Sequence, residues 1–250
     1  MRRVLLALVL LLAATPAGAE KLIATVSSSS VEITSSFDGA VLSLFGTIEP
    51  DTPGIALSGP YNVIVIVTGP LQDRVARLKT NNWGIWTNTD QVVFRQFPSF
   101  YEVLSSGRLD QIATAQFIAE RNVLPDSQAV AAAQSTGIRS VQFGTELVRL
   151  MTSEGHFSLQ QNGVRFLSDT AYIAQVTLPS DVANGPFLAR TLVLKDHELV
   201  AEGTSGFSVR KNGFENFVFV ASRQQPLLYG LVCVALALGT GWFAGVAFKR

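Results

Sequence analysis

The chain has 250 residues and a mass of 26.9 kDa, enough for one large or two small globular domains. Hydrophobic residues make up 48% and charged residues 15%, and the mean hydropathy is +0.31. This composition excludes a disordered chain and indicates that part of the apolar excess lies in lipid. The 19 basic residues balance the 19 acidic ones, which excludes the basic surface of a nucleic-acid-binding protein. The single cysteine cannot form an intrachain disulfide or a CxxC site.

Residues 1–19 have the pattern of a signal peptide. Two arginines precede the apolar stretch Val4–Ala14, and Ala17 and Ala19 supply an A-x-A cleavage motif. An uncleaved anchor is the alternative, but the apolar stretch is short for a bilayer core of about 30 Å. We expect cleavage after Ala19 and a mature chain that begins at Glu20.

Residues 20–108 show the period of two that is typical of strands. Turn-forming pairs such as Gly69-Pro70 separate the apolar runs. The unbroken run Val63–Val67 predicts a strand that is buried on both faces. We interpret residues 20–108 as the first part of a β-sandwich.

A helical period replaces the strand pattern in residues 109–160. An alanine-rich stretch follows Leu109, and Pro125 interrupts it. After this break, apolar residues recur at helical spacing at Phe143, Leu147, Leu150 and Met151. We expect two or three helices that form an insertion in the β fold.

Strand patterns return in residues 161–225, ending with Phe217–Val220 after an Asn212-Gly213 turn. Short strands with turn signals every eight to twelve residues or so are typical of immunoglobulin-type sandwiches. The sequence therefore predicts a mainly β protein with an immunoglobulin-like β-sandwich ectodomain. The two β segments form either one composite sandwich or two small ones.

Residues 226–248 are expected to form a transmembrane helix. Leu227–Phe248 contains no charged residue, and at 1.5 Å per residue it spans roughly 33 Å, one bilayer crossing. A buried helix of a soluble core is the alternative, and such helices rarely stay uncharged over this length. Lys249 and Arg250 follow as a cytoplasmic tail, by the positive-inside rule. We expect a single-pass protein of the inner (plasma) membrane with a periplasmic body.

Within this helix, Gly241 and Gly245 form a small-xxx-small pattern that lets helix backbones approach closely. Ala235 and Gly239 form an alternative stripe. We expect the Gly241 and Gly245 face to pack against another transmembrane helix, either of an integral membrane partner or of a second copy.

Five segments of the chain carry a resemblance to a known family. They are VEITSSFDGAVLSLFG (31–46), YNVIVIVTGP (61–70), NNWGIW (81–86), FPSFYEVLSS (97–106) and FSVRKNGFENFVF (207–219), ahead of the PLLYG that starts the anchor. The chain resembles the putative alphaproteobacterial transmembrane protein family, a family of unknown function, over nearly the whole mature length. The resemblance implies an exported, C-terminally anchored protein and a permease as a partner. It implies no catalytic residues.

Six aromatic residues lie close together in the sequence, at Trp83, Trp86, Phe94, Phe97, Phe100 and Tyr101. They either form a recognition surface or fill the core at an open end of the sandwich. We favour the core interpretation, which exposed tryptophans would contradict.

Three cations, Arg74, Arg77 and Lys79, precede this aromatic stretch. Guanidinium groups suit the recognition of oxyanions, so an anion site is conceivable; a solvated strand edge is the alternative that we favour. Together with Trp83 and Trp86, these cations are the candidate ligand-binding residues.

The sequence shows no catalytic or metal-binding motif. Of the 2 histidines, His197 lies in a predicted exposed turn, where adjacent side chains diverge, and His156 has no acid or nucleophile near it in the sequence. Cys233 lies in the predicted membrane span, too apolar a place for a thiolate nucleophile. We expect no catalytic residue, no metal and no cofactor.

These observations favour a non-enzymatic, membrane-anchored periplasmic module that binds a partner protein or a small ligand. A single helix cannot form a transport path, so the module is expected to be an accessory subunit of an integral membrane transporter. The alternative is an envelope hydrolase or anion-processing enzyme. Its site would be assembled from the distant residues His156, His197 and Arg74 to Lys79.

Overall fold

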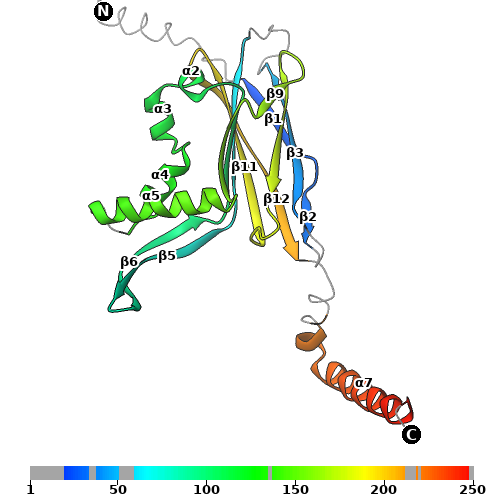
Figure 1. Ribbon diagram of the computed structural model, residues 1–250. Helices are drawn as coiled ribbons and strands as arrows, with labels where there is room; N and C mark the ends of the chain where they lie inside the picture. Colours follow the sequence, from blue (N-terminus) through cyan, green and yellow to red (C-terminus); the bar gives the residue numbers. More distant parts are fainter. Residues whose placement is uncertain are drawn as a thin grey trace, which may run out of the picture.

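The computed structural model describes residues 20–33, 38–50, 59–134, 137–211, 218 and 221–247 (Figure 1). The predicted signal peptide 1–19, the Asn212-Gly213 turn, the last residue of the predicted span and the tail 249–250 lie outside the described residues. Of the predicted strand Phe217–Val220, only Val218 is described, and it is helical. The described chain is mainly β, with several helices and a long apolar helix near its C-terminus.

One layer of the body is a four-stranded sheet. Its order is β1-β3-β10-β9, and each neighbouring pair is antiparallel. The strands are β1 (Lys21–Val26), β3 (Ala40–Glu49), β10 (Ala171–Leu178) and β9 (Val164–Phe166).

The other layer is a six-stranded sheet of order β2-β12-β11-β4-β7-β8. Its pairs are antiparallel except β2 with β12 and β7 with β8, which are parallel. The strands are β2 (Ser30–Ile33), β12 (Glu198–Lys211), β11 (Gly185–Lys195), β4 (Asn62–Thr68), β7 (Tyr101–Ser105) and β8 (Phe157–Gln161).

Apolar side chains of both sheets form one core between them. In β4, Val63, Val65 and Val67 face this core, whereas Ile64 and Ile66 face a second cluster on the outer side of the sheet. All five are at most 1% exposed, which confirms the prediction of a strand buried on both faces. Because β3 pairs with β10 and β4 pairs with β11, the strands before and after the helices share one core.

Four helices cover the outer face of the six-stranded sheet (Figure 1). They are α2 (Leu109–Ile112), α3 (Ala115–Glu120), α4 (Pro125–Ala132) and α5 (Ile138–Ser153). They connect β7 to β8, two parallel neighbours, and a parallel connection needs a crossover of this length. The helical segment therefore builds the second cluster of the core.

Three details of the predicted helical segment were wrong. Its described residues form four helices and not two or three. Its last residues, 157–160, are not helical but belong to β8 at the edge of the sheet. In α5, Leu150 is 46% exposed, and the buried residues are Ser140, Gly144, Val148 and Met151. Small residues line this face because a Cβ at Gly144 would lie only 3.0 Å from the Cβ of Ala129.

The strand directions define two ends of the sandwich. At the loop end, the Asp196-His197 turn joins β11 to β12. At the opposite end, called the anchor end, β12 finishes at Lys211, ahead of the apolar helix α7 (Pro226–Ala247). A hairpin of β5 (Leu71–Asn82) and β6 (Ile85–Pro98) forms a separate two-stranded sheet and projects beside α5 (Figure 1).

Candidate functional site

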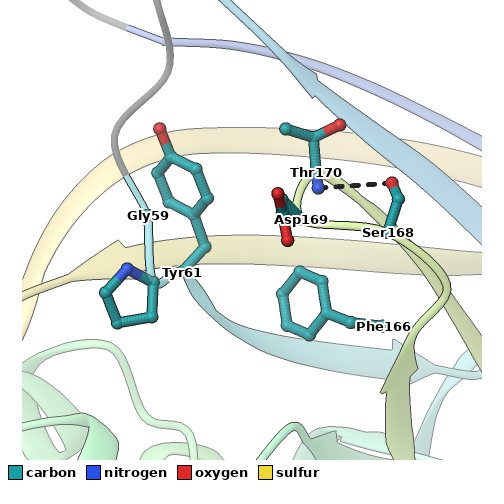
Figure 2. A pocket seen from close by; sticks show the side chains of 7 residues that line it. Gly59, Tyr61, Phe166, Ser168, Asp169 and Thr170 are labelled. Carbon is teal, nitrogen blue, oxygen red and sulfur yellow. Dashed lines mark hydrogen bonds between the residues drawn. The ribbon is translucent and has the colours of Figure 1, made fainter.

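Two cavities lie at the loop end of the sandwich. The first has a volume of about 460 Å³ and lies between the start of β4 and the β9–β10 loop (Figure 2). Its described lining residues are Gly59, Pro60, Tyr61, Phe166, Ser168, Asp169 and Thr170. We call it the tyrosine cavity.

The tight β9–β10 loop positions one wall of the tyrosine cavity. The Leu167 N–H donates to the carbonyl of Ala171 at 2.8 Å, and the Ala171 N–H donates to Oγ of Ser168 at 3.0 Å. The Phe166 ring packs edge-on against Tyr172, with 6.4 Å between centroids. These contacts leave the side chains of Phe166 and Asp169 facing Tyr61, as Figure 2 shows.

Tyr61 forms the other wall and is itself buried. Its hydroxyl donates to Oε1 of Glu20 at 2.8 Å. Burial, followed by the bond to Glu20 and the charge of that carboxylate, raises the pKa of Tyr61 to about 12. The phenol therefore stays neutral at physiological pH, and it offers a ring rather than a charge to the cavity.

Asp169 is the only charged residue among the described residues of the cavity lining. It is exposed, with the rings of Tyr61 and Phe166 and the hydroxyls of Ser168 and Thr170 around it. A carboxylate next to aromatic faces suits a cation. In the described ranges, no group of three or more His, Cys, Asp or Glu residues could hold a metal ion.

The second cavity, of about 570 Å³, lies between α2, α3, the end of β8 and His197. Arg108 and Asp110 at its rim form a bidentate ion pair, with contacts of 3.1 and 2.8 Å. The two charges neutralise each other, so this cavity offers no free charge from that pair. Leu109, Ile118 and Leu159 contribute apolar surface.

The candidate residues Arg74, Arg77, Lys79, Trp83 and Trp86 all lie on the β5–β6 hairpin. The structure therefore brings them together, but away from both cavities. Arg77 contacts Gln91 on the neighbouring strand, with Nε 3.5 Å from Oε1. The three cations lie along one strand, β5, and line neither of the two cavities.

The aromatic stretch divides into two groups. Phe94, Phe97, Phe100 and Tyr101 are at most 2% exposed, which confirms the core interpretation for these four. Phe97 stacks on Phe157 with 5.3 Å between centroids. Trp83 and Trp86, in contrast, are 102% and 66% exposed, so the core interpretation was wrong for the tryptophans.

The two histidines lie at opposite ends of the six-stranded sheet. His156 precedes β8 at the anchor end and is 8% exposed, with Nε2 3.1 Å from Oδ2 of Asp181. His197 lies in the β11–β12 turn at the loop end. β11 has 11 residues between these ends, a separation of roughly 30 Å, so the two imidazoles cannot act in one site.

The residues of the tyrosine cavity were missed in the sequence. Gly59-Pro60 is only a turn signal, and Ser168-Asp169-Thr170 is only a polar cluster between two apolar runs. Nothing local to either segment indicates that they meet. Their proximity depends on the pairing of β10 with β3 and of β4 with β11 across two sheets.

Gly241 and Gly245 lie on α7, and a Cβ at either would meet no described atom within 4 Å. This helix, over Pro226–Val246, is long and apolar enough to cross a membrane, and none of its apolar window is buried in the described chain. No curated protein matches the sequence. A model of a family described as putative transmembrane protein matches residues 21–250. The chain thus belongs to this transmembrane protein family, and α7 is the one candidate membrane span among its described residues.

Proposed function

We propose that this protein is a non-enzymatic, membrane-anchored module that binds a small ligand at the loop end of its sandwich. The observation that carries the proposal is the placement of both cavities. The tyrosine cavity and the α2–α3 cavity lie at the loop end, whereas β12 leaves for the membrane helix at the anchor end. The cavities therefore face away from the bilayer, where a ligand can enter.

The strand order supports an immunoglobulin-like assignment of the variable type. In that fold one sheet contains strands A, B, E and D, and the other contains G, F and C with C′ and C″ added. In chain order, β1-β3-β10-β9 and β12-β11-β4-β7-β8 follow the same arrangement. The parallel β7–β8 pair departs from it. A crystal structure with a different pairing of β8 or β9 would contradict the assignment.

This assignment gives the loop end a function. In variable-type domains the loops B–C, C′–C″ and F–G form the binding end. Here the connection that corresponds to B–C is the one that precedes Tyr61, and the one that corresponds to C′–C″ carries the helices α2 to α5. The F–G connection corresponds to the Asp196-His197 turn. The cavities lie among these connections.

A small organic cation is the ligand class that the tyrosine cavity fits best. Asp169 supplies one negative charge, and Tyr61 and Phe166 supply aromatic faces. Arg74, Arg77 and Lys79, the residues of the alternative anion site, line neither of the two cavities.

Binding of choline to the full chain in nanodiscs tests this proposal, with acetate as the probe of opposite charge. Choline should bind and acetate should not. Asp169→Asn should weaken choline binding by about fivefold, the scale of one exposed charge pair. Asp196→Asn is the matched control, because it removes an exposed carboxylate at the same end outside the tyrosine cavity. Equal binding of the two probes would refute a cation site.

The proposed topology has residues 20 to about 225 in the periplasm, one crossing of the inner membrane, and Lys249 and Arg250 in the cytoplasm. The predicted signal peptide and the positive-inside rule support it. Alkaline phosphatase fused after Gln225 should be active. An inactive fusion would contradict the orientation.

The same topology supports an accessory role beside an integral membrane transporter. The Gly241 and Gly245 face is uncovered in the single chain, and such a face allows close helix packing. Replacing both glycines by Leu should reduce co-purification of a partner or of a second copy without reducing export. Unchanged association would remove this role for the glycines.

The enzymatic alternative loses its geometric basis. It needs His156, His197 and the cations at Arg74 to Lys79 in one site, and these lie at opposite ends and on a projecting hairpin. A binding module should tolerate Ala at both histidines. Loss of the cellular role in a folded His156→Ala or His197→Ala variant would favour an enzyme instead.

A further inference from the structure

The β5–β6 hairpin ends in an apolar tip. Trp83 is 102% exposed, and Ile85 and Trp86 are 67% and 66% exposed. A group of large exposed apolar side chains marks an interaction site, whereas single ones are ordinary surface. We propose that this tip enters the headgroup region of the bilayer that α7 crosses, and that it sets the orientation of the sandwich relative to the membrane.

The turn at the tip places a tryptophan where the backbone disfavours it. Asn82 pairs with Ile85, so the turn residues are Trp83 and Gly84, with φ of 55° and 82°. Two positive φ values define the type I′ turn, which prefers Asn or Asp before Gly. A bulky residue at positive φ is an outlier, and such outliers cluster at functional sites.

The hairpin forms a long paired arm. Its ladder runs from Leu71 opposite Pro98 to the turn, with irregularities between Gln72 and Arg74 and between Leu78 and Lys79, and Oγ1 of Thr80 donates to Oγ1 of Thr89 at 3.2 Å. Arg139 of α5 contacts the arm through an ion pair of 2.8 Å with Asp90. Beyond Asp90 the arm extends by about 17 Å at 3.3 Å per residue.

The arm leaves the sandwich at the anchor end. β4 and β12 run in the same direction, because both are antiparallel to β11. β4 ends at Thr68, and Pro70 then touches the start of β11, where a Cβ at Gly185 would lie 2.7 Å from its Cγ. Gly185 pairs with Val209 near the end of β12. Figure 1 shows the hairpin and α7 at the same end of the molecule.

The chemistry of the tip fits a bilayer surface. Tryptophan prefers the interface between hydrocarbon and headgroups. Arg77 and Lys79 lie just behind the tip, and the sequence has no acidic residue between Asp73 and Asp90, so anionic headgroups are favoured. Because α7 tethers the arm, even weak insertion is effective at the high local concentration of lipid.

Tryptophan fluorescence of the full chain tests the proposal. Trp242→Phe leaves Trp83 and Trp86 as the remaining two of the 3 tryptophans. This variant is reconstituted into vesicles of mixed phosphatidylcholine and phosphatidylglycerol, with bromine on the upper part of the acyl chains. The emission should shift to the blue and be quenched by about twofold or more, as expected for interfacial tryptophan. Emission typical of water-exposed tryptophan without quenching would overturn the proposal.

Two charge variants separate lipid contact from general effects. Lys79→Glu should reduce quenching in the mixed vesicles and have little effect in pure phosphatidylcholine. Arg165→Glu makes the same charge change on an exposed residue of β9, away from the tip. It should not change the quenching in either kind of vesicle. An equal loss of quenching in both variants would overturn the proposal. Crosslinking of the tip to a membrane protein in native membranes, without quenching by lipid, would also overturn it.

This inference goes beyond the proposed ligand function and does not depend on it. Choline binding reports on the tyrosine cavity at the loop end, whereas lipid quenching reports on Trp83 and Trp86 at the anchor end. Either result can fail while the other stands.

Discussion

Two long hairpins of this chain share a backbone design and differ in their surroundings. β11 and β12 have 11 and 14 residues, and β5 and β6 have 12 and 14. Each hairpin closes with a turn in which both central residues have positive φ, Asp196-His197 in the first and Trp83-Gly84 in the second. The first lies inside the six-stranded sheet, whereas the second is a sheet of its own.

Side chains account for the difference. In β11, Leu192, Val193 and Leu194 are fully buried, but no residue of β5 is buried. The turn residues are polar at the loop end and aromatic at the anchor end. The first hairpin thus builds the core, whereas the second joins the core through Phe94 and Phe97 of β6 and carries an apolar group outward at its tip.

The largest expected loss of stability follows from a substitution of Phe187 in β11. Its ring stacks on Phe207 with 5.0 Å between centroids and is fully buried. Phe187→Ala should lower the free energy of unfolding by about 3 to 5 kcal/mol, the usual range for a buried Phe. Val75→Ala, at an exposed position of β5, should change it by about 0.5 kcal/mol or less. Denaturant unfolding of the full chain in detergent measures both, and similar losses would break the comparison.

The six-stranded sheet that contains the first hairpin also buries a carboxyl group. Glu102 of β7 is 2% exposed and accepts a hydrogen bond of 2.7 Å from Nε2 of Gln160. Burial raises the pKa of Glu102 from 4.5 to about 7. The folded state therefore binds this proton more tightly than the unfolded state. The stability from this group is complete below pH 4.5 and is lost as the pH rises through 7.

Glu102→Gln should remove this pH dependence. The shift corresponds to about 3 kcal/mol at most, so the variant should be more stable than the parent chain at pH above 7 and similar to it in acid. Thermal unfolding of the parent chain and of Glu102→Gln across this pH range measures the difference, and a parallel profile for the two chains would contradict the buried-acid argument.

The smallest expected change in stability comes from substitutions in the turns of the two hairpins. Trp83→Asn places the preferred residue at its positive φ and should stabilise the hairpin by about 1 kcal/mol. Amide hydrogen exchange in the hairpin should then slow by about fivefold, while lipid contact through Trp83 is lost. Asp196→Asn with His197→Gly is the matched change in the other turn, and it should leave lipid contact intact. Faster exchange in Trp83→Asn would contradict a strained turn.

Much of the fold could be predicted because its signals are local. The buried strand at Val63–Val67 and the apolar helix α7 are each a single uninterrupted pattern. The extent of the helical segment was less accurate, because β8 (Phe157–Gln161) is a short edge strand whose side chains are mostly exposed. Its strand state comes from pairing with β7 and not from its own apolar period.

The candidate sites were harder to predict for the same reason. Trp83 and Phe97 are both aromatic residues in one stretch of sequence, yet one is at the tip of a hairpin and the other is fully buried. Whether each side chain is buried depends on how far the hairpin extends beyond α5. Tyr61 and Asp169 meet only across two sheets, so no spacing rule connects them.

The position of β12 has a mechanical consequence. It is hydrogen-bonded to β11 on one side and to β2 on the other, and it is the strand that leads to the membrane helix. A pull applied between the loop end and the membrane helix is transmitted along this strand. Its hydrogen bonds lie across that direction, so the load shears many of them together instead of opening them one by one. The body should therefore resist tension between its loop end and its anchor far better than tension that peels an edge strand such as β8 away from the sheet.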